Sequence, residues 1–323
     1  MKLVNSVMPK EVFKKALLVA LIVVAVLLLY SSLMNTGLPS FSAHSLAASL
    51  AIFMAGWLVS AIRLKMLVRA CDPASSCSFR TFVEARFLGE LLARITPSSI
   101  GGEPARAYHI SRNTKLGYLE AYMLTLYEVY FDVVLTCLVG AIVSVPYLPP
   151  SLPVLLVSIL TAFAWVLAFN LIDKIKVRRE ISGHTRMGRL LRNERLNRLV
   201  GYIKTSRTYY AEIRSKVKAS RVILAWLLTA LVHVLWGFSV VPLIVDKHGG
   251  SVSPLTALKE GVSAYFLMQA ISIIPTPGGS GVAEYGLTLV LAPDIVVAYR
   301  GIYYFIPLAI GLAVSLRYLR EKG

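Results

Sequence analysis

Residues Ile273–Glu284 read IIPTPGGSGVAE and interrupt an apolar run that begins near Leu255 and resumes at Tyr285. Pro275 and Pro277 lack an amide N–H and clash with the preceding helical turn, so a helix cannot continue through them. Three glycines allow the backbone to turn sharply, namely Gly278, Gly279 and Gly281. A backbone break inside an apolar run survives where it is buried in protein or lines a water-filled cavity. We therefore predict that this stretch is the functional centre.

A second stretch of the chain resembles the first. Val83–Gly102 reads VEARFLGELLARITPSSIGG, and Val262–Gly279 reads VSAYFLMQAISIIPTPGG. Each copy has Val-x-Ala-x-Phe-Leu, then an apolar helix, a proline and Gly-Gly, although the alignment needs a gap of two residues. This similarity predicts an internal repeat, with a chance match as the alternative. The break in the first copy contains Pro97, Gly101, Gly102, Glu103 and Arg106.

The composition indicates a membrane protein. Hydrophobic residues make up 56% of the chain, and the mean hydropathy is +0.67 despite a formal net charge of +17. A soluble all-α domain is usually less apolar, and several segments reach the ~20 residues that a membrane-spanning helix requires. We predict an all-α polytopic membrane protein, a single integral membrane domain over 1–323, with about eight helical membrane segments and two broken or re-entrant hairpins. The expected helical segments are 16–34, 46–67, 79–95, 118–145, 154–172, 222–244, 255–274, 285–297 and 302–319.

A strongly basic segment, residues 173–221, separates the two halves. It contains fifteen Lys and Arg residues against four Asp and Glu residues. Leu196, Ile203 and Tyr210 recur within it at helical spacing, which predicts an amphipathic helix on an anionic membrane surface. Because anionic lipid already accounts for a juxtamembrane polybasic segment, we do not expect a nucleic-acid partner.

The distribution of basic residues predicts the topology. The N-terminal lysines, residues 63–86, the segment 173–221 and the C-terminal tail are basic, whereas the loops 35–45 and 146–153 carry no charge. The positive-inside rule then places both termini in the cytoplasm, in a multi-pass protein of the cell membrane. On this topology the two broken segments start from opposite sides, as the inverted repeats of alternating-access transporters do.

The two breaks resemble a known family. The motifs are Pro97-x-x-x-Gly101-Gly102-x-x-x-Arg106 and Pro275-x-Pro277-Gly278-Gly279-x-Gly281-x-x-Glu284. They resemble the transmembrane region of lysylphosphatidylglycerol synthases, a family that includes free-standing, flippase-like proteins, and the resemblance covers nearly the whole chain. Glu128 and Asp132 look like the acidic pair of that family. Because the chain ends at Gly323, we expect no aminoacyl-transferase domain, and the resemblance implies lipid translocation or a helper role in making a lipid-linked product.

Ionisable residues inside the apolar segments are the candidate site residues, since charges at membrane depth usually face a partner or a polar pathway. Glu90 and Arg94 are spaced i,i+4 and can neutralise each other. Glu128 and Asp132 have the same spacing but must share a proton or find a cation, which Arg86, Arg94, Arg106 or Arg300 could supply. Glu284 stands in the first turn of the resumed helix, where it either caps that helix or carries protons.

These observations lead us to expect a lipid transporter that binds an anionic headgroup, either of a phospholipid or of a polyprenyl-phosphate lipid. The expected headgroup site comprises Arg94, Pro97, Gly101, Gly102, Glu103, Arg106, Pro275, Pro277, Gly278, Gly279 and Gly281. The residues expected to balance charge or couple protons are Glu90, Glu128, Asp132 and Glu284.

Two other function classes remain open. One is a membrane enzyme or subunit in lipid-linked sugar or aminoacyl-lipid synthesis, and the other is a non-catalytic adaptor that docks a cytoplasmic glycosyltransferase through residues 173–221. A homo-oligomer is compatible with the sequence. We expect no cofactor and no metal, because the five histidines and three cysteines show no recognisable ligand spacing.

Overall fold

The computed structural model describes residues 9–37, 39–96, 101–174 and 206–320. These residues form helices joined by turns, and no strand occurs among them, which confirms the all-α class. The α-helices of the first half are α2 (Pro9–Leu33), α3 (Ala43–Cys71), α4 (Phe79–Ile95), α5 (Gly102–Asn113), α6 (Tyr118–Ser144) and α7 (Leu152–Lys174). The helices of the second half are residues 206–216, α10 (Ala219–Phe238), α11 (Val241–Lys247), α12 (Pro254–Ile271), α13 (Val282–Thr288), α14 (Pro293–Arg300), the π-helical η4 (Gly301–Phe305) and α15 (Ile306–Arg320).

Six segments of the described chain are long and apolar enough to cross a membrane. Large apolar side chains on them are exposed, for example Ile142 at 71% and Leu160 at 67%. Such exposure is stable when the surrounding solvent is hydrocarbon, so the protein is a multi-pass membrane protein. The six segments are Glu11–Leu33, Ala43–Cys71, Tyr118–Tyr147, Leu152–Leu171, Ala219–Lys247 and Pro293–Arg317.

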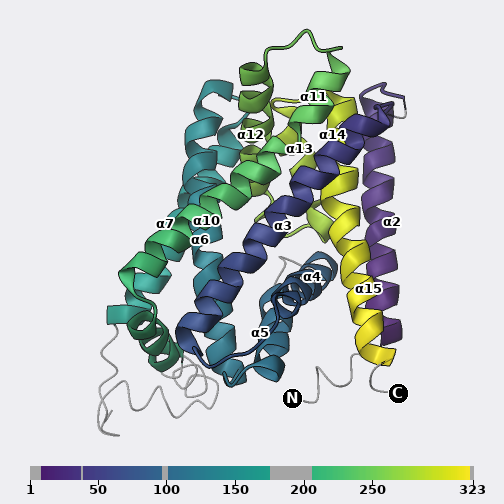
Figure 1. Ribbon diagram of the computed structural model, residues 1–323. Helices are drawn as coiled ribbons and strands as arrows, with labels where there is room; N and C mark the ends of the chain where they lie inside the picture. The colour runs from purple at the N-terminus through teal and green to yellow at the C-terminus, as the bar shows by residue number, and fades with distance from the viewer. Residues whose placement is uncertain (1–8, 38, 97–100, 175–205, 321–323) are drawn as a thin grey trace, which may run out of the picture.

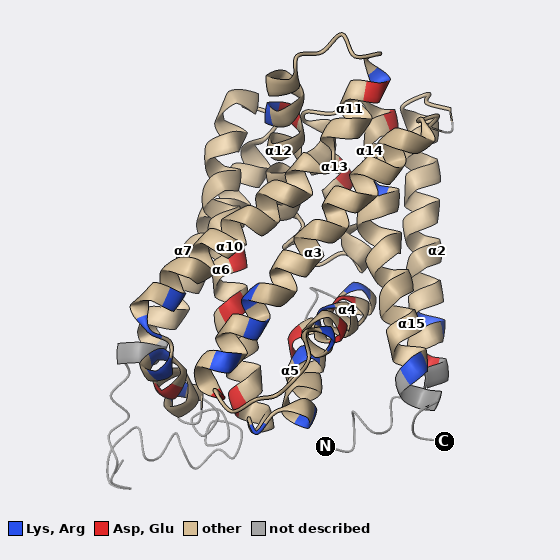
Figure 2. Cartoon of the chain, in the orientation of Figure 1, with Lys and Arg blue, Asp and Glu red and all other residues tan. Residues whose placement is uncertain are grey.

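The two broken segments form hairpins that enter the molecule from opposite ends (Figure 1). In one hairpin α4 rises from the end where both chain termini lie, and α5 returns to that end. In the other, α12 descends from the opposite end and α13 returns to it. These are the directions that an inverted repeat requires. Figure 2 shows that Lys and Arg are concentrated at the end near the termini and around the α4–α5 hairpin.

The C-terminal part of the chain differs from its prediction. The sequence predicts one helix over 285–297 and another over 302–319, with a break between them. The structure instead turns after α13 and begins α14 at Pro293, a residue favoured in the first turn of a helix. The interval at Gly301–Phe305 is π-helical rather than broken, so residues 293–317 form one candidate span.

The basic segment is described only from residue 206 onward, so Leu196 and Ile203 lie outside the described residues. Residues 206–216 are helical. Tyr210 is buried against the bundle, with its ring centroid 6.0 Å from that of Tyr127 and 5.4 Å from that of Phe169. This part of the apolar stripe therefore packs on α6 and α7.

Two close helix crossings involve the arms of the second hairpin, α12 and α13. A Cβ atom on Gly237 of α10 would lie 2.8 Å from the Cα atom of Val262 on α12, and one on Gly286 of α13 would lie 2.7 Å from the Cα atom of Met268. Small residues permit such backbone approaches in membrane bundles. The second hairpin is consequently packed tightly against α10, and its two arms, α12 and α13, are packed tightly against each other.

Candidate functional site

Glu128 is the centre of a buried charge cluster. Its side chain is fully buried, and three arginines from three different helices contact it. Arg63 Nε of α3 lies 3.1 Å from Oε1, Arg86 Nη2 of α4 contacts the same oxygen, and Arg106 Nη1 of α5 lies 3.3 Å from Oε2. A carboxylate removed from water needs such compensation. Glu128 therefore fixes both arms of the first hairpin to α6.

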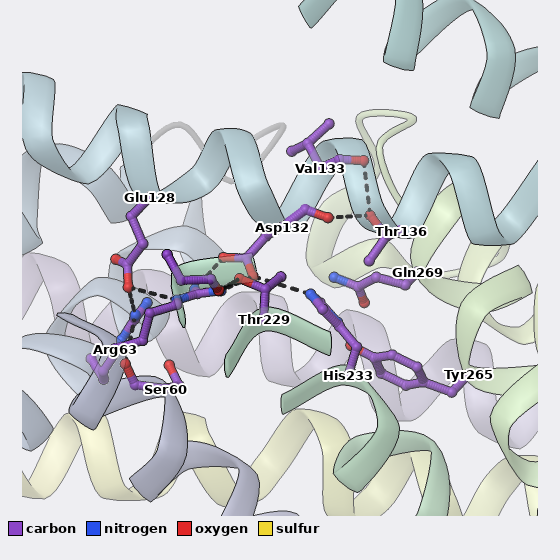
Figure 3. Close-up of polar contacts among 12 residues, drawn as sticks. Ser60, Arg63, Glu128, Asp132, Val133, Thr136, Thr229, His233, Tyr265 and Gln269 are labelled. Atoms are coloured by element: carbon purple, nitrogen blue, oxygen red, sulfur yellow. Dashed lines mark hydrogen bonds and ion pairs between the residues drawn. The ribbon is translucent and has the colours of Figure 1, made fainter. Parts of the chain in front are cut away.

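Asp132 lies one turn farther along α6 and continues the network (Figure 3). Arg63 binds it with two parallel contacts, Nη1 to Oδ1 at 2.7 Å and Nη2 to Oδ2 at 2.6 Å, and Arg63 Nη1 also donates to the hydroxyl of Thr229. His233 Nε2 lies 3.1 Å from Asp132 Oδ1, and its Nδ1 lies 2.7 Å from the hydroxyl of Tyr265. A neutral imidazole satisfies both contacts if Nε2–H donates to Asp132 and Nδ1 accepts from Tyr265.

This cluster carries an excess of positive charge. The three arginines Arg63, Arg86 and Arg106 face only two contacting carboxylates. The Nε atoms of Arg86 and Arg106 are also buried without a hydrogen-bond partner in the described part of the protein, although buried donors are nearly always paired in proteins. The contacting carboxylates therefore leave one positive charge of this cluster unbalanced.

Glu284 and Arg300 form a second, self-contained charge pair at the other hairpin. Glu284 Oε2 accepts from the Gly281 amide at 2.6 Å, so Glu284 caps its own helix, and Oε1 lies 2.6 Å from Arg300 Nε. Arg300 Nη2 donates to the Gly278 carbonyl at 3.0 Å. Both charged side chains are buried and neutralise each other. The pair closes the glycine-rich loop onto the start of the C-terminal span.

The amides of this loop are mostly used within it. The Gly279 amide donates to Thr276 O and the Ser280 amide to Pro277 O, each at 3.1 Å, and Glu284 accepts from Gly281. The amides of Gly279, Ser280 and Gly281 are therefore already bonded within the loop, which corrects the expectation that the Gly278–Gly281 amides hold a headgroup. The glycines serve the geometry of the turn, because Gly278, Gly279 and Gly281 have φ angles of 62°, 70° and 83°.

Arg94 lies at the end of α4, close to the second hairpin. Its Nη2 is 3.1 Å from Glu90 Oε2, which is the predicted i,i+4 pair. The guanidinium also lies over the rings of Tyr303 and Tyr304, at 5.2 Å and 5.3 Å from their centroids. Its Nε is buried without a partner among the described residues. Arg94 therefore adds a further guanidinium group to the cluster of charges, close to the second hairpin.

A cavity of about 520 Å³ joins these groups. Its described lining contains five arginines and three carboxylates, so the cavity surface carries more positive than negative groups. Three tryptophans and Gln269 also contribute. The arginines are Arg63, Arg86, Arg94, Arg106 and Arg300; the carboxylates are Glu90, Glu103 and Asp132; the tryptophans are Trp57, Trp165 and Trp236.

The predicted site residues divide into those that face the cavity and those that support it. The cavity-lining members are Glu90, Arg94, Glu103, Arg106, Asp132, Gly278 and Gly279. The remaining described members do not line it: Gly101, Gly102, Glu128, Pro275, Pro277, Gly281 and Glu284. Gly101 donates its amide to Thr96 Oγ1 at 2.9 Å, which closes the start of α5 onto the end of α4. Pro97 lies outside the described residues.

Arg63 is the main residue whose place differs from its prediction. The charge pattern predicts it at the cytoplasmic end of the second span, but α3 continues to Cys71, and the Arg63 side chain is buried. Its neighbours Ile62 and Leu64 are apolar, and this interruption of an apolar run was the available signal. The contacts of Thr229 and Tyr265 carry no comparable signal, because they depend on which helices lie side by side.

Comparison with known proteins agrees with this architecture. A family model described as lysylphosphatidylglycerol synthase TM region matches residues 17–311. Searches of the curated proteins and of the solved structures found no match. The family match includes both hairpins and the whole charge cluster. The chain therefore belongs to the family of the lysylphosphatidylglycerol synthase transmembrane region.

Proposed function

We propose that this protein moves an anionic lipid between the leaflets of the membrane, with the lipid phosphate bound in the central cavity by Arg86 and Arg106. The observation that carries the proposal is the surplus of positive charge at the cavity, whose described lining contains five arginines against three carboxylates. Arg86 and Arg106 belong to a cluster in which three arginines share two carboxylates. Hydrogen bonds from arginine to phosphate are charge-assisted and geometrically specific, so a phosphate is the ligand that best fits these guanidinium groups.

The arrangement of the hairpins supports transport rather than storage of the lipid. Broken helices that enter from opposite ends and meet at a polar cavity are typical of alternating-access transporters. The headgroup would cross this cavity while the acyl chains remain in hydrocarbon. With the basic end of the molecule in the cytoplasm, the α4–α5 hairpin would face the inner leaflet of the cell membrane.

The acidic residues have supporting roles in this proposal. Glu128 and Asp132 hold the arginines in position, and the contacts of Glu284 with Gly281 and Arg300 hold the loop. Each of these carboxylates accepts from an arginine. Because their oxygens are engaged by arginines, we assign the three acids to charge balance rather than to proton coupling.

Reconstituted vesicles test the proposal. Tail-labelled fluorescent phosphatidylglycerol would be incorporated in both leaflets, and a membrane-impermeant quencher added outside. Vesicles with the wild-type protein should lose fluorescence from both leaflets. Arg106→Ala should slow the loss from the inner leaflet by at least ~10-fold, because it removes one charge-assisted hydrogen bond to the phosphate. Arg80→Ala is the matched control, because Arg80 lies on α4 of the same hairpin with its side chain 55% exposed.

The outcomes separate the function classes. Wild-type transport that Arg106→Ala leaves unchanged would exclude the proposed phosphate site. Absence of wild-type transport, with the lipid recovered in a chemically altered form by mass spectrometry, would favour a membrane enzyme. Absence of both would favour an adaptor.

A further inference from the structure

The C-terminal span, residues 293–317, is held by a different hairpin at each end. Its first part, α14, is bonded to the second hairpin, because Arg300 Nε donates to Glu284 Oε1 of α13 at 2.6 Å. Its second part, α15, packs on α4 of the first hairpin, where a Cβ atom on Gly311 would lie 2.6 Å from the carbonyl oxygen of Phe87. Any movement of one hairpin against the other therefore acts on this span.

The π-helical turn η4 separates these two parts of the span. Its Tyr303 and Tyr304 rings lie 5.2 Å and 5.3 Å from the Arg94 guanidinium of α4. The Tyr303 hydroxyl also donates to Gln269 Oε1 of α12 at 2.8 Å. The turn thus lies where the two hairpins meet. Single π-helical turns inside helices are rare and are frequent at functional sites.

The sequence provides a chemical reason for a wider turn at this point. Pro307 is the second residue of α15, just after η4. It has no amide N–H to donate to the Tyr303 carbonyl, its partner in an α-helix, and its ring would clash with that carbonyl. Sharp bends in helices occur at prolines and at π-bulges, and residues 301–307 contain both. The hydrogen-bond ladder of the span is therefore interrupted at the junction between its two parts.

We propose that η4 and Pro307 form a hinge, at which the C-terminal span bends as α14 moves with the second hairpin and α15 with the first. This inference rests on the proposed function, because alternating access moves one repeat against the other. Hinge motions are absorbed by a few residues, and the interrupted ladder is where this span yields most easily. Pro307 does not line the central cavity, so it acts on transport through the geometry of the span.

Restoring the missing N–H tests the hinge. Pro307→Ala and Pro307→Val both allow a continuous α-helix, but they leave side chains of different volume at this buried position. Both should slow lipid transport in vesicles by about 10- to 100-fold, because the cost of proline in a helix interior corresponds to about two factors of ten. Loss of packing alone would separate the two variants, and alanine would lower the melting temperature more than valine.

Pro254→Ala is the matched control for these variants. Pro254 is exposed in the first turn of α12, where a proline breaks no helical hydrogen bond. Its transport rate should equal that of the wild type. Loss of transport in both Pro307 variants, without a lower melting temperature in detergent, supports the hinge.

A distance measurement between the hairpins tests the hinge without depending on transport. Nitroxide labels on Arg80→Cys of α4 and Leu255→Cys of α12 occupy exposed positions, and pulsed EPR reports their separation. Cys77→Ser removes the partly exposed native thiol, whereas Cys71 and Cys137 are buried. The protein would be studied in phosphatidylcholine nanodiscs with and without phosphatidylglycerol. Phosphatidylglycerol should shift the distance distribution of the otherwise wild-type chain and leave that of both Pro307 variants unchanged.

Three results would overturn the inference. One is transport at the wild-type rate in both Pro307 variants, and another is a label separation that responds to phosphatidylglycerol in these variants as it does without them. The third is a wild-type separation that does not respond to the lipid at all. A response that only the Pro307 variants lose, in a protein that moves no lipid in vesicles, would keep the hinge and refute the proposed function, so the two failures are distinguishable.

Discussion

The two hairpins share a sequence pattern but use their charges differently. In the α4–α5 hairpin, Arg86 and Arg106 reach across to Glu128 on α6 and keep unpartnered Nε donors. In the second hairpin, Glu284 and Arg300 neutralise each other and close their own loop. In the proposed function the two hairpins have different roles: the first binds the ligand, and the second maintains the shape of the turn that faces it.

The largest expected effect comes from Glu128, because three arginines depend on it. Glu128→Gln should lower the free energy of unfolding by about 3–5 kcal/mol, since removal of one partner leaves buried charges uncompensated. Thermal melting in detergent measures the loss. Arg86→Met, alone and combined with Glu128→Gln, completes a double-mutant cycle. If Glu128→Gln melts at the wild-type temperature, Glu128 does not hold the first hairpin.

Glu284→Gln should be the next most severe change, because the amide keeps an acceptor for Gly281 but loses the charge that faces Arg300. We expect a loss of about 1–3 kcal/mol in the free energy of unfolding. The pH dependence of lipid transport should remain that of the wild type. A flattened pH profile at unchanged melting temperature would instead assign Glu284 to proton coupling.

The backbone of the second hairpin gives a smaller and cleaner test. Gly281 has a φ of 83° and open space where a Cβ atom would lie, so Gly281→Ala should cost about 1–2 kcal/mol through conformation alone. Gly117 is likewise the N-cap of its helix and has open space, but its φ is −65°, so Gly117→Ala loses only a favoured N-cap residue and should be less destabilising by about 1–2 kcal/mol. Equal melting temperatures for the two variants would show that the loop relaxes and that its geometry is not held.

The smallest expected effect comes from a partly exposed ion pair outside both hairpins. Lys216 Nζ lies 2.7 Å from Glu212 and 3.2 Å from Glu120, and these contacts, led by the Glu212 hydrogen bond, raise its pKa to about 12. Because the side chain is about one-third exposed, Lys216→Gln should cost at most about 1 kcal/mol.

The pH dependence of this small effect follows from the sign of the shift. A raised lysine pKa stabilises the fold fully below the unfolded value of about 10.4, and the contribution is lost as the pH rises through about 12. The difference in melting temperature between wild type and Lys216→Gln should therefore be the same at pH 7 and pH 9. A difference that disappears by pH 9 would contradict the ion pairing seen here.

Much of the fold could be predicted from the sequence, because it depends on residues that are close together in the chain. Apolar runs specify helices in hydrocarbon, proline and glycine specify the two breaks, and the spacing of Glu90 and Arg94 specifies their ion pair. The helix-capping role of Glu284 could also be predicted, as one of two alternatives, because it depends only on residues three positions apart.

Tertiary structure alone decided which charges meet. Arg63 lies 65 positions from Glu128, and His233 lies 101 positions from Asp132, so no local pattern relates them. An arginine near the end of an apolar run can extend toward the membrane surface or turn inward, and the packing of α3 against α6 and α10 selects the inward position. The five arginines that line the cavity likewise meet only in the packed bundle, because they come from four different helices.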